Sequence, residues 1–292
     1  MRILLTGAGG QVGQELVEVL KEDVDVELMA CDRTSLDLTQ PQVIADRVWA
    51  FQPQVIINAA AYTAVDKAEA EPELAHAINA LAPGYLAQAA TQVGASLVHI
   101  STDYVFDGTQ SVPYREDSLC NPLGVYGLTK LAGEQAAVAG CDRTLILRTA
   151  WVYGAKGKGN FAKTILRLAQ ERESLRVVYD QIGSPTWAYD IARVIVALLP
   201  QLGPETYGTY HFTNSGVASW YDFAVAIAEE ARALGVPLTL NQIEPITTAD
   251  YPTPARRPAY SVLGGEKIAG MLGTTPPHWR QSLRHMLAEF YS

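Results

Sequence analysis

The chain begins MRILLTGAGGQVG (residues 1–13), a short apolar run that leads directly into a glycine cluster. This pattern predicts a strand over residues 2–6, a tight turn and a helix over residues 11–21. Glycine lets the backbone turn tightly and approach a pyrophosphate, and the helix N-terminus adds free N–H groups and partial positive charge. We therefore expect a dinucleotide-binding loop. Its expected residues are Gly7, Gly9, Gly10, Gln11, Val12 and Gly13.

A second expected strand, residues 26–31, ends at Asp32 and Arg33. An acidic residue about 20 positions beyond such glycines can hydrogen-bond a ribose 2′-OH, and a nearby arginine can accept a 2′-phosphate. Asp37 and Leu38 follow closely enough to lie beside the adenine. We expect these residues to favour NADPH while keeping NADH usable. The alternative is that Asp32 and Arg33 are a solvated loop pair.

The first half of the chain alternates short apolar runs with helical patterns. Runs such as Val55-Ile56-Ile57 are apolar throughout, so both faces of the expected sheet must be covered. We expect an α/β fold, a doubly wound (Rossmann) parallel sheet. Further strands are expected at residues 55–58, 96–101 and 144–148, and helices at residues 41–51, 73–93 and 129–138. The helix over residues 73–93 should break or kink near Pro83.

The second half is less regular. Helices are expected at residues 160–170, 189–199 and 220–234, with extended segments at 176–179 and 210–212. Residues 245–258 hold four prolines and should be a loop or an extended segment. We expect a dinucleotide-binding domain over residues 1–150, to which residues 176–215 return. Residues 151–175 and 216–292 should form a smaller C-terminal α/β substrate-binding lobe.

Composition excludes several classes of function. The chain of 292 residues carries 31 acidic and 22 basic side chains, a net charge of −9, which disfavours nucleic acids and anionic membranes. Its three cysteines have no CxxC spacing, which argues against a disulfide framework and a zinc site. No apolar run approaches the roughly 18 residues of a membrane span. We expect a soluble, cytoplasmic protein.

Tyr126 and Lys130 are four residues apart, so they share one face of a helix, and Tyr126 follows Thr102 by 24 residues. Reducing a carbonyl group requires a hydride donor and a proton donor at the same oxygen. A tyrosine has a pKa of about 10, and a neighbouring lysine ammonium together with the positive nicotinamide of the oxidised cofactor should lower that pKa. We expect Thr102, Tyr126 and Lys130 to be catalytic, with Lys130 also reaching the nicotinamide ribose. The alternative is a surface tyrosine and lysine without a catalytic role.

Together with the glycine loop, this order of residues resembles the short-chain dehydrogenase/reductase superfamily in its extended form. Longer motifs make the chain similar to the dTDP-4-dehydrorhamnose reductase family, from Met1 to about Phe290. The motifs are NAAAYTAVDKAE (58–69), STDYVFDG (101–108), RTAWVYG (148–154), GNF (159–161), DQIGSPT (180–186) and YPTPARRP (251–258).

The resemblance implies NAD(P)H-dependent reduction of the C4 keto group of dTDP-4-dehydro-L-rhamnose, which gives dTDP-L-rhamnose and completes dTDP-rhamnose biosynthesis. It also implies further site residues. Those along the cofactor are Ala60, Ala61, Tyr62 and Asn79, in addition to Tyr126 and Lys130. Those facing the substrate are Thr63, Val65, Ser101, Thr102, Tyr104, Tyr126, Trp151, Asn160 and Arg256. Trp151 could instead be a core residue and Arg256 a solvated loop charge. His99 lies inside a strand and is expected to be a packed core residue.

Two other functions remain open. Related nucleotide-sugar dehydratases carry Asp-Glu after the threonine and related epimerases a cysteine, whereas here Asp103 and Tyr104 follow Thr102. A regulatory subunit of methionine adenosyltransferase also resembles this family and binds nucleotide without this turnover. The complete Thr102, Tyr126 and Lys130 set argues against that non-catalytic alternative.

Some family members form a homodimer around magnesium held by three glutamates per chain. Glu15 and Glu289 match two of these positions, but Tyr189 stands at the third, and a neutral phenol is a poor magnesium ligand. Asp190 is adjacent, yet one residue along a helix turns a side chain by about 100°. We expect no metal site, activity without magnesium, and any homodimer to be held by other contacts.

Overall fold

A six-stranded, all-parallel sheet forms the centre of the computed structural model, which describes all 292 residues. The strands lie in the order β10-β5-β4-β3-β1-β2. Their bounds are β1 (Arg2–Thr6), β2 (Glu27–Cys31), β3 (Val55–Asn58), β4 (Ser96–Thr102), β5 (Thr144–Thr149) and β10 (Gly208–His211). The predicted doubly wound parallel sheet is thereby confirmed.

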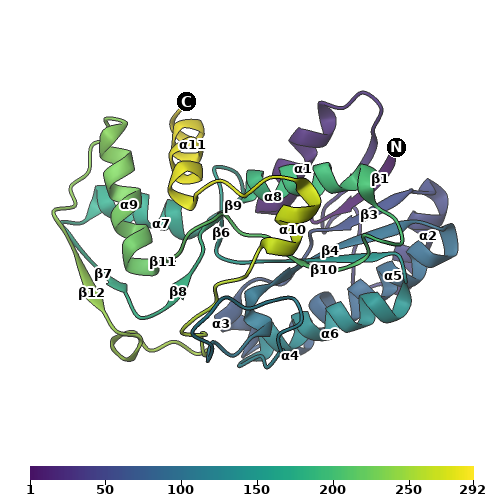
Figure 1. Cartoon of the computed structure of the whole chain (residues 1–292), viewed down its shortest axis with the longest axis horizontal. Helices are drawn as coiled ribbons and strands as arrows, with labels where there is room; N and C mark the ends of the chain where they lie inside the picture. Colours follow the sequence, from purple (N-terminus) through teal and green to yellow (C-terminus); the bar gives the residue numbers. More distant parts are fainter.

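Helices cover both faces of this sheet (Figure 1). Helices α1 (Gln11–Lys21) and α8 (Ala188–Leu198) lie on one face, and α2 (Pro41–Phe51), α5 (Ala82–Val93) and α6 (Val125–Gly140) on the other. Strand β1 shows why its central residues must be apolar on both faces: Ile3 and Leu5 pack towards Leu16, while Leu4 packs towards Ile44. Alternate side chains of one strand therefore enter two different cores.

The helix expected over residues 73–93 does not break at Pro83. Instead α4 (Pro72–His76) runs through a π-helical turn (Ala77–Leu81) into α5, so the irregularity lies before the proline. Pro83 stands in the first turn of α5, where the lost N–H costs least. Single π turns in helices often occur at functional sites, and this one contains Asn79.

A second group of elements packs around its own core, on the left of Figure 1. Strand β7 (Ser174–Val178) pairs in parallel with β12 (Gln242–Ile246). The helices here are α7 (Phe161–Glu171), α9 (Trp220–Ala233) and α11 (Trp279–Tyr291), which bury Phe223, Trp279 and Leu283. Short pairs join β6 (Val152–Tyr153) to β9 (Thr186–Trp187) and β8 (Ile182–Gly183) to β11 (Ala218–Ser219). The remaining helices are α3 (Val65–Ala68) and α10 (Glu266–Leu272).

Elements of the second half thus divide between the two cores. Helix α8 packs against α1 and strand β10 pairs with β5, so both lie with the six-stranded sheet. Strand β7 belongs to the second core. The domain boundaries given above stay a prediction. No helix combines the length and apolar character needed to cross a bilayer. All three cysteines are unpaired.

Candidate active site

The glycine loop lies where the strand order reverses, because β1 lies between β2 and β3. Ligands of doubly wound sheets bind at the carboxyl ends of the strands at such a point. Gly7 has φ +73°, and a Cβ there would lie 2.5 Å from the Ala60 nitrogen. A Cβ on Gly13 would lie 2.0 Å from the Gly7 oxygen. Gly7 therefore lets the loop pack against the residues that follow β3, and Gly13 lets helix α1 pack against the loop.

Helix α1 offers an uncapped N-terminus beside this loop. Its N-cap Gly10 makes no side-chain hydrogen bond, and the first turn holds no acidic residue. The N–H groups of this turn and the positive end of the helix dipole suit a pyrophosphate. The side chain of Gln11 accepts a hydrogen bond of 2.8 Å from Asn160 Nδ2.

Asp32 borders the loop, since a Cβ on Gly9 would lie 4.0 Å from its Cβ. Its Oδ1 accepts hydrogen bonds from the backbone N–H and hydroxyl groups of Thr34 and Ser35. These bonds lower the pKa of Asp32 to about 2, so the carboxylate is charged at neutral pH. Arg33 is exposed and forms no ion pair. Asp37 accepts from Thr39, and Leu38 is buried.

Asn79 holds the loop that follows β3. Its Oδ1 accepts from the Tyr62 N–H at 2.8 Å, and its Nδ2 donates to the Tyr62 oxygen at 3.0 Å. Nδ2 also lies 3.3 Å from Thr129 Oγ1 on α6. Ala60, earlier in this loop, donates its N–H to Asn58 Oδ1. The π turn therefore places Asn79 so that it fixes the backbone at Tyr62.

The three expected catalytic residues come together at the end of β4. Thr102 is the last residue of β4, Tyr126 lies in the first turn of α6, and Lys130 follows one turn later. A Cβ on Gly127 would lie 2.2 Å from the Tyr104 oxygen, so this glycine allows α6 to pack against the end of β4. The ring of Tyr104 meets the ring of Tyr126 edge-on at 5.3 Å.

Burial decides the acidity of Tyr126. It raises the pKa of the phenol to about 12, the Thr102 hydroxyl opposes that rise, and the Asp103 carboxylate adds to it. The sequence predicted a pKa lowered jointly by Lys130 and the oxidised nicotinamide; in the protein alone the pKa is raised, and the lowering with cofactor bound stays a prediction. Desolvation disfavours the phenolate, and in the protein alone it is the largest cause of the shift.

Lys130 is 1% exposed, and burial lowers its pKa to about 8, with Glu134 opposing. Its Nζ donates to the Ile100 oxygen at 2.6 Å and lies 3.5 Å from His99 Nε2. Glu134 forms a buried two-pronged ion pair with Arg148, at 2.9 and 2.7 Å. His99 is buried as predicted, but its contact with Lys130 was not expected.

Asp103 is a buried carboxyl group that sequence reasoning missed. Its Oδ1 accepts from Thr102 Oγ1 at 3.0 Å, and its Oδ2 has no partner. Burial raises its pKa to about 6, although the hydrogen bond from Thr102 opposes that rise. The hydroxyls of Ser101 and Thr149 are also buried without a partner. Unpaired buried polar atoms are rare and mark the end of β4 as a place for a polar ligand.

Trp151 has φ +49°, a strained conformation for a bulky residue. Its indole stacks on that of Trp220 with centroids 3.5 Å apart and an interplanar angle of 1°. A Cβ on Gly183 would lie 2.4 Å from the Trp151 ring. The Trp151 indole is therefore held in one orientation by its neighbours. Trp220 was not among the site residues predicted from the sequence.

The segment holding Arg256 docks onto α3, the short helix that follows β3. Arg257 pairs with Asp66 at 2.8 and 3.1 Å, and the Ala255 N–H donates to Asp66 at 3.2 Å. Arg256 is exposed and makes no ion pair. Thr63 is exposed, and Val65 starts α3 one residue before Asp66. Sequence periodicity gives no way to choose between two adjacent arginines in an irregular segment.

Asn160 is engaged within the chain. Its Oδ1 accepts from the Lys163 N–H and so caps α7. Its Nδ2 donates to Gln11 Oε1 and to the Gly154 oxygen, both at 2.8 Å. The residue therefore ties the glycine loop to the second core, and the substrate contact expected of it stays a prediction.

The carboxylates matched to a magnesium site surround an ammonium group. Lys156 Nζ lies 2.9 Å from Glu15, 2.9 Å from Glu18 and 3.3 Å from Glu289. Burial raises the pKa of Glu15 and Lys156 opposes that rise, while the carboxylates raise the pKa of Lys156. Asp190 faces elsewhere and accepts from Asn214 and Ser282. The ammonium of Lys156 occupies the point on which these carboxylates converge, so the residues as placed hold a lysine rather than a divalent ion.

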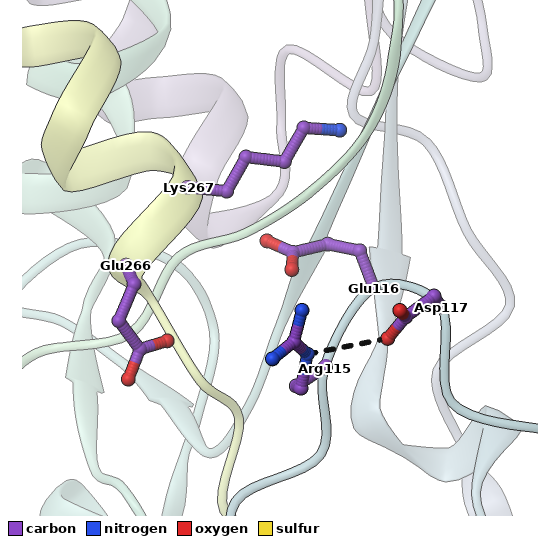
Figure 2. A pocket seen from close by; sticks show the side chains of 5 residues that line it. All are labelled: Arg115, Glu116, Asp117, Glu266 and Lys267. Atoms are coloured by element: carbon purple, nitrogen blue, oxygen red, sulfur yellow. Dashed lines mark ion pairs between the residues drawn. The ribbon is translucent and has the colours of Figure 1, made fainter.

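A cavity of about 660 Å³ lies at the edge strand β10, and Figure 2 shows its lining of five charged side chains. They are Arg115, Glu116, Asp117, Glu266 and Lys267. Glu116 accepts from the His211 N–H at 3.1 Å, and Lys267 donates to the Thr209 oxygen at 2.7 Å. Small-molecule sites are mostly apolar, and this lining has no hydrophobic residue. It also holds none of the expected site residues, so it is not the candidate active site.

A glycine loop at the switch point of a doubly wound sheet, with threonine, tyrosine and lysine at β4 and α6, defines an extended short-chain dehydrogenase/reductase. The family model for the RmlD substrate binding domain matches residues 1–292. The chain belongs to the dTDP-4-dehydrorhamnose reductase family.

Relatives match over their full length. The chain is 46% identical to a dTDP-4-dehydrorhamnose reductase of Escherichia coli strain K12, covering 100% of this chain and 99% of that one. Among solved structures, a dTDP-4-dehydrorhamnose reductase of Clostridium acetobutylicum is 41% identical, with a TM-score of 0.92 and full coverage of both chains. One from Bacillus anthracis, solved in complex with NADP, is 39% identical, with a TM-score of 0.91 and 99% coverage of both.

Proposed function

We propose that this protein reduces the C4 keto group of dTDP-4-dehydro-L-rhamnose with NAD(P)H and releases dTDP-L-rhamnose. The observation that carries the proposal is the meeting of Thr102, Tyr126 and Lys130 at the end of β4, in a chain of this family. The identity of the substrate is inferred from the names of these relatives. The side chains at the end of β4 are the groups that such a reduction needs.

The residues around the glycine loop fit a nicotinamide dinucleotide. Gly7 and Gly13 leave no room for a Cβ, and the α1 N-terminus is uncapped, as a bound pyrophosphate requires. Such a cofactor supplies a hydride when bound. Asp32 keeps Oδ2 for a ribose hydroxyl because Oδ1 is engaged by Thr34 and Ser35. Exposed Arg33 suits a 2′-phosphate, so NADPH is the preferred form and NADH is also accepted.

In the reduction, hydride adds to C4 and a proton adds to O4. Tyr126 gives that proton, since its raised pKa keeps it protonated at neutral pH. Thr102 hydrogen-bonds the same oxygen and so helps to position it. Lys130 restores the proton on Tyr126, because burial brings its own pKa close to neutral. Ser101 and Tyr104 complete the wall around the sugar.

The nucleotide-sugar is held by residues from both cores. Trp151 presents a rigid indole beside β4 and β5, and Thr63 and Val65 come from the loop after β3. Arg256 faces the diphosphate, for which a planar guanidinium is suited. Asn160 stands between the glycine loop and the second core, where a ligand spanning both would touch it.

We also propose that activity does not need magnesium and that any homodimer is held by other contacts. The support is Lys156, whose ammonium lies among Glu15, Glu18 and Glu289. A divalent ion would have to displace this lysine. Hydride transfer with tyrosine as the acid also leaves no step for a metal.

The proposed function is tested by mixing purified protein with dTDP-4-dehydro-L-rhamnose and NADPH. We expect stoichiometric loss of absorbance at 340 nm and a product identified by NMR as dTDP-L-rhamnose. Cofactor binding without oxidation would favour the non-catalytic alternative. Loss of water or inversion at carbon, without net reduction, would favour a dehydratase or an epimerase.

A further inference from the structure

His99 lies in the middle of β4 with no exposed surface, and its ring joins two polar neighbours. Its Nδ1 is 3.0 Å from Asn58 Nδ2, at the end of the adjacent strand β3. Its Nε2 is 3.5 Å from Lys130 Nζ. A chain of buried polar contacts therefore runs from Asn58 through His99 to Lys130, the lysine of the candidate active site.

The hydrogen bonds of Asn58 determine which ring nitrogen of His99 carries the hydrogen. Asn58 Oδ1 accepts from Thr6 Oγ1 at 2.7 Å and from the Ala60 N–H at 3.2 Å. Its Nδ2 must then face His99 and donate to Nδ1. Burial and the charge of Lys130 lower the pKa of His99 far below its ordinary value, so the ring is neutral. A neutral ring that accepts at Nδ1 carries its hydrogen on Nε2.

The Nε2–H of His99 consequently points at Lys130. An ammonium has three donors and no acceptor, so two donors face each other when Lys130 is charged. A neutral amine has a lone pair that can accept this N–H. Two other groups act in the opposite direction: the Ile100 oxygen accepts from Nζ at 2.6 Å, and the Glu134 carboxylate on the same helix favours the charged form. Glu134 is itself neutralised by its ion pair with Arg148.

We propose that His99 is a positioning residue of the reaction, which disfavours the ammonium form of Lys130 through its Nε2–H and so prepares Lys130 to return a proton to Tyr126. The inference rests on the proposed function for its catalytic consequence. After Tyr126 has protonated O4, the phenolate takes a proton from Lys130. The neutral amine that remains accepts the His99 N–H until solvent reprotonates it.

Two variants change this contact in different ways. In His99→Asn, the side-chain oxygen can still accept from Asn58 Nδ2, but no group reaches Lys130. In Asn58→Asp, a carboxylate faces Nδ1 and draws the hydrogen there, which turns the Nε2 lone pair towards Lys130. Both changes should favour the ammonium form of Lys130 and so raise its pKa. Asn58→Asp keeps the His99 ring and hence the burial of Lys130, whereas His99→Asn also removes buried volume beside the lysine, so the two variants separate the contact from packing.

The first experiment follows the Nζ and Cε resonances of Lys130 by NMR in the full chain without substrate, with Lys130→Arg used for assignment. We expect a midpoint near the pKa of about 8 in the wild type. In both variants the midpoint should rise by about one pH unit, a tenfold change in proton affinity. An unchanged or lowered midpoint in both would overturn the proposal.

The second experiment needs no variant. The ¹⁵N shifts of His99 report which ring nitrogen carries the hydrogen, and we expect Nε2–H between pH 6 and 8. A hydrogen on Nδ1, or a charged ring in this range, would overturn the proposal even if neither variant folded. Both measurements are independent of turnover. A failure here is therefore distinct from a failure to reduce the keto-sugar.

Discussion

Arg257 and Asp66 form a two-pronged ion pair, 2.8 and 3.1 Å long, between residues separated by 191 positions in the chain. The pair joins the proline-rich segment over residues 245–258 to α3, the short helix that follows β3. Both side chains are partly exposed, so water screens the pair. We expect the pair to act mainly by positioning the neighbouring residues Arg256 and Thr63 for substrate binding.

Arg257→Gln should therefore affect substrate binding more than stability. A pair as exposed as this one contributes at most about 1 kcal/mol, so the melting temperature should fall by only a few degrees. We expect the KM for the nucleotide-sugar to rise several-fold with little change in kcat. Arg256→Gln is the companion variant and should raise KM without any thermal shift. Equal kcat losses in both variants would contradict a binding role.

Tyr126→Phe should retain the fold and cofactor binding but lose about 10²- to 10⁴-fold in kcat, the usual contribution of a general acid. Thr102→Val should cost less, because it removes a hydrogen bond rather than the proton donor. Single-turnover measurement of NADPH oxidation gives the rates. The control is Tyr291→Phe, which removes a phenol hydroxyl at the exposed end of α11. A Tyr126→Phe rate near that of the control would mean another proton donor.

Arg33→Ala should raise the KM for NADPH and leave the KM for NADH nearly unchanged, because only NADPH carries the 2′-phosphate. The residue is exposed and makes no ion pair, so stability should not change. Steady-state kinetics with each cofactor gives the two KM values separately. Equal losses with both cofactors would place Arg33 away from the adenine ribose.

Asp103→Asn should change the dependence of stability on pH. The pKa of Asp103 is raised to about 6 in the folded state, so the folded state binds a proton more tightly than the unfolded state. The protonated carboxyl is favourable at low pH, and this contribution to stability is lost as pH rises from about 4 to 6. At pH 7.5 the buried charge costs up to about 3 kcal/mol. The variant should be more stable than the wild type at pH 7.5 and no more stable at pH 4.

Urea unfolding at the two pH values measures this difference. The same variant removes a negative charge that raises the pKa of Tyr126, so the alkaline limb of kcat should move to lower pH. Asp117→Asn, at an exposed carboxylate, is the matched control and should change neither property. A wild-type stability that is flat between pH 4 and 6 would contradict the shift.

Lys156→Gln should leave Glu15 buried without a positive partner. Removing one member of a buried ion pair typically costs about 3–5 kcal/mol, and partial exposure of Lys156 reduces this cost. We expect a clearly lower melting temperature that magnesium partly restores, since three carboxylates are then free. The wild type should show no thermal shift with magnesium and no loss of activity with EDTA. Activity lost in EDTA and recovered with magnesium would overturn metal independence.

Where the sequence carries a periodic or conformational signal, it predicts the molecule well. The all-apolar runs at β1, β3 and β5 determine a covered parallel sheet, and Gly7 and Gly13 determine a loop that only glycine can form. The spacing of Tyr126 and Lys130 determines their common helix face. Each of these signals is written in a short stretch of sequence.

What the sequence could not predict depends on pairs of residues far apart in the chain. Arg257 rather than Arg256 meets Asp66 because the irregular backbone, with no helical or strand period, sets the side-chain direction. In the protein alone the pKa of Tyr126 is raised because burial outweighs the effect of neighbouring groups. The π turn lies before Pro83 because Asn79 must reach the loop after β3.

The outer edge of β10 is closed by side chains. Glu116 occupies the His211 N–H and Lys267 the Thr209 oxygen, and the ammonium of Lys267 also lies 4.1 Å from the Tyr210 ring. A strand from another molecule would have to displace two charged groups before it could pair there. Sheets that end in unprotected strands can act as templates for fibrils. At this edge the enzyme therefore resists intermolecular strand pairing, even at high protein concentration.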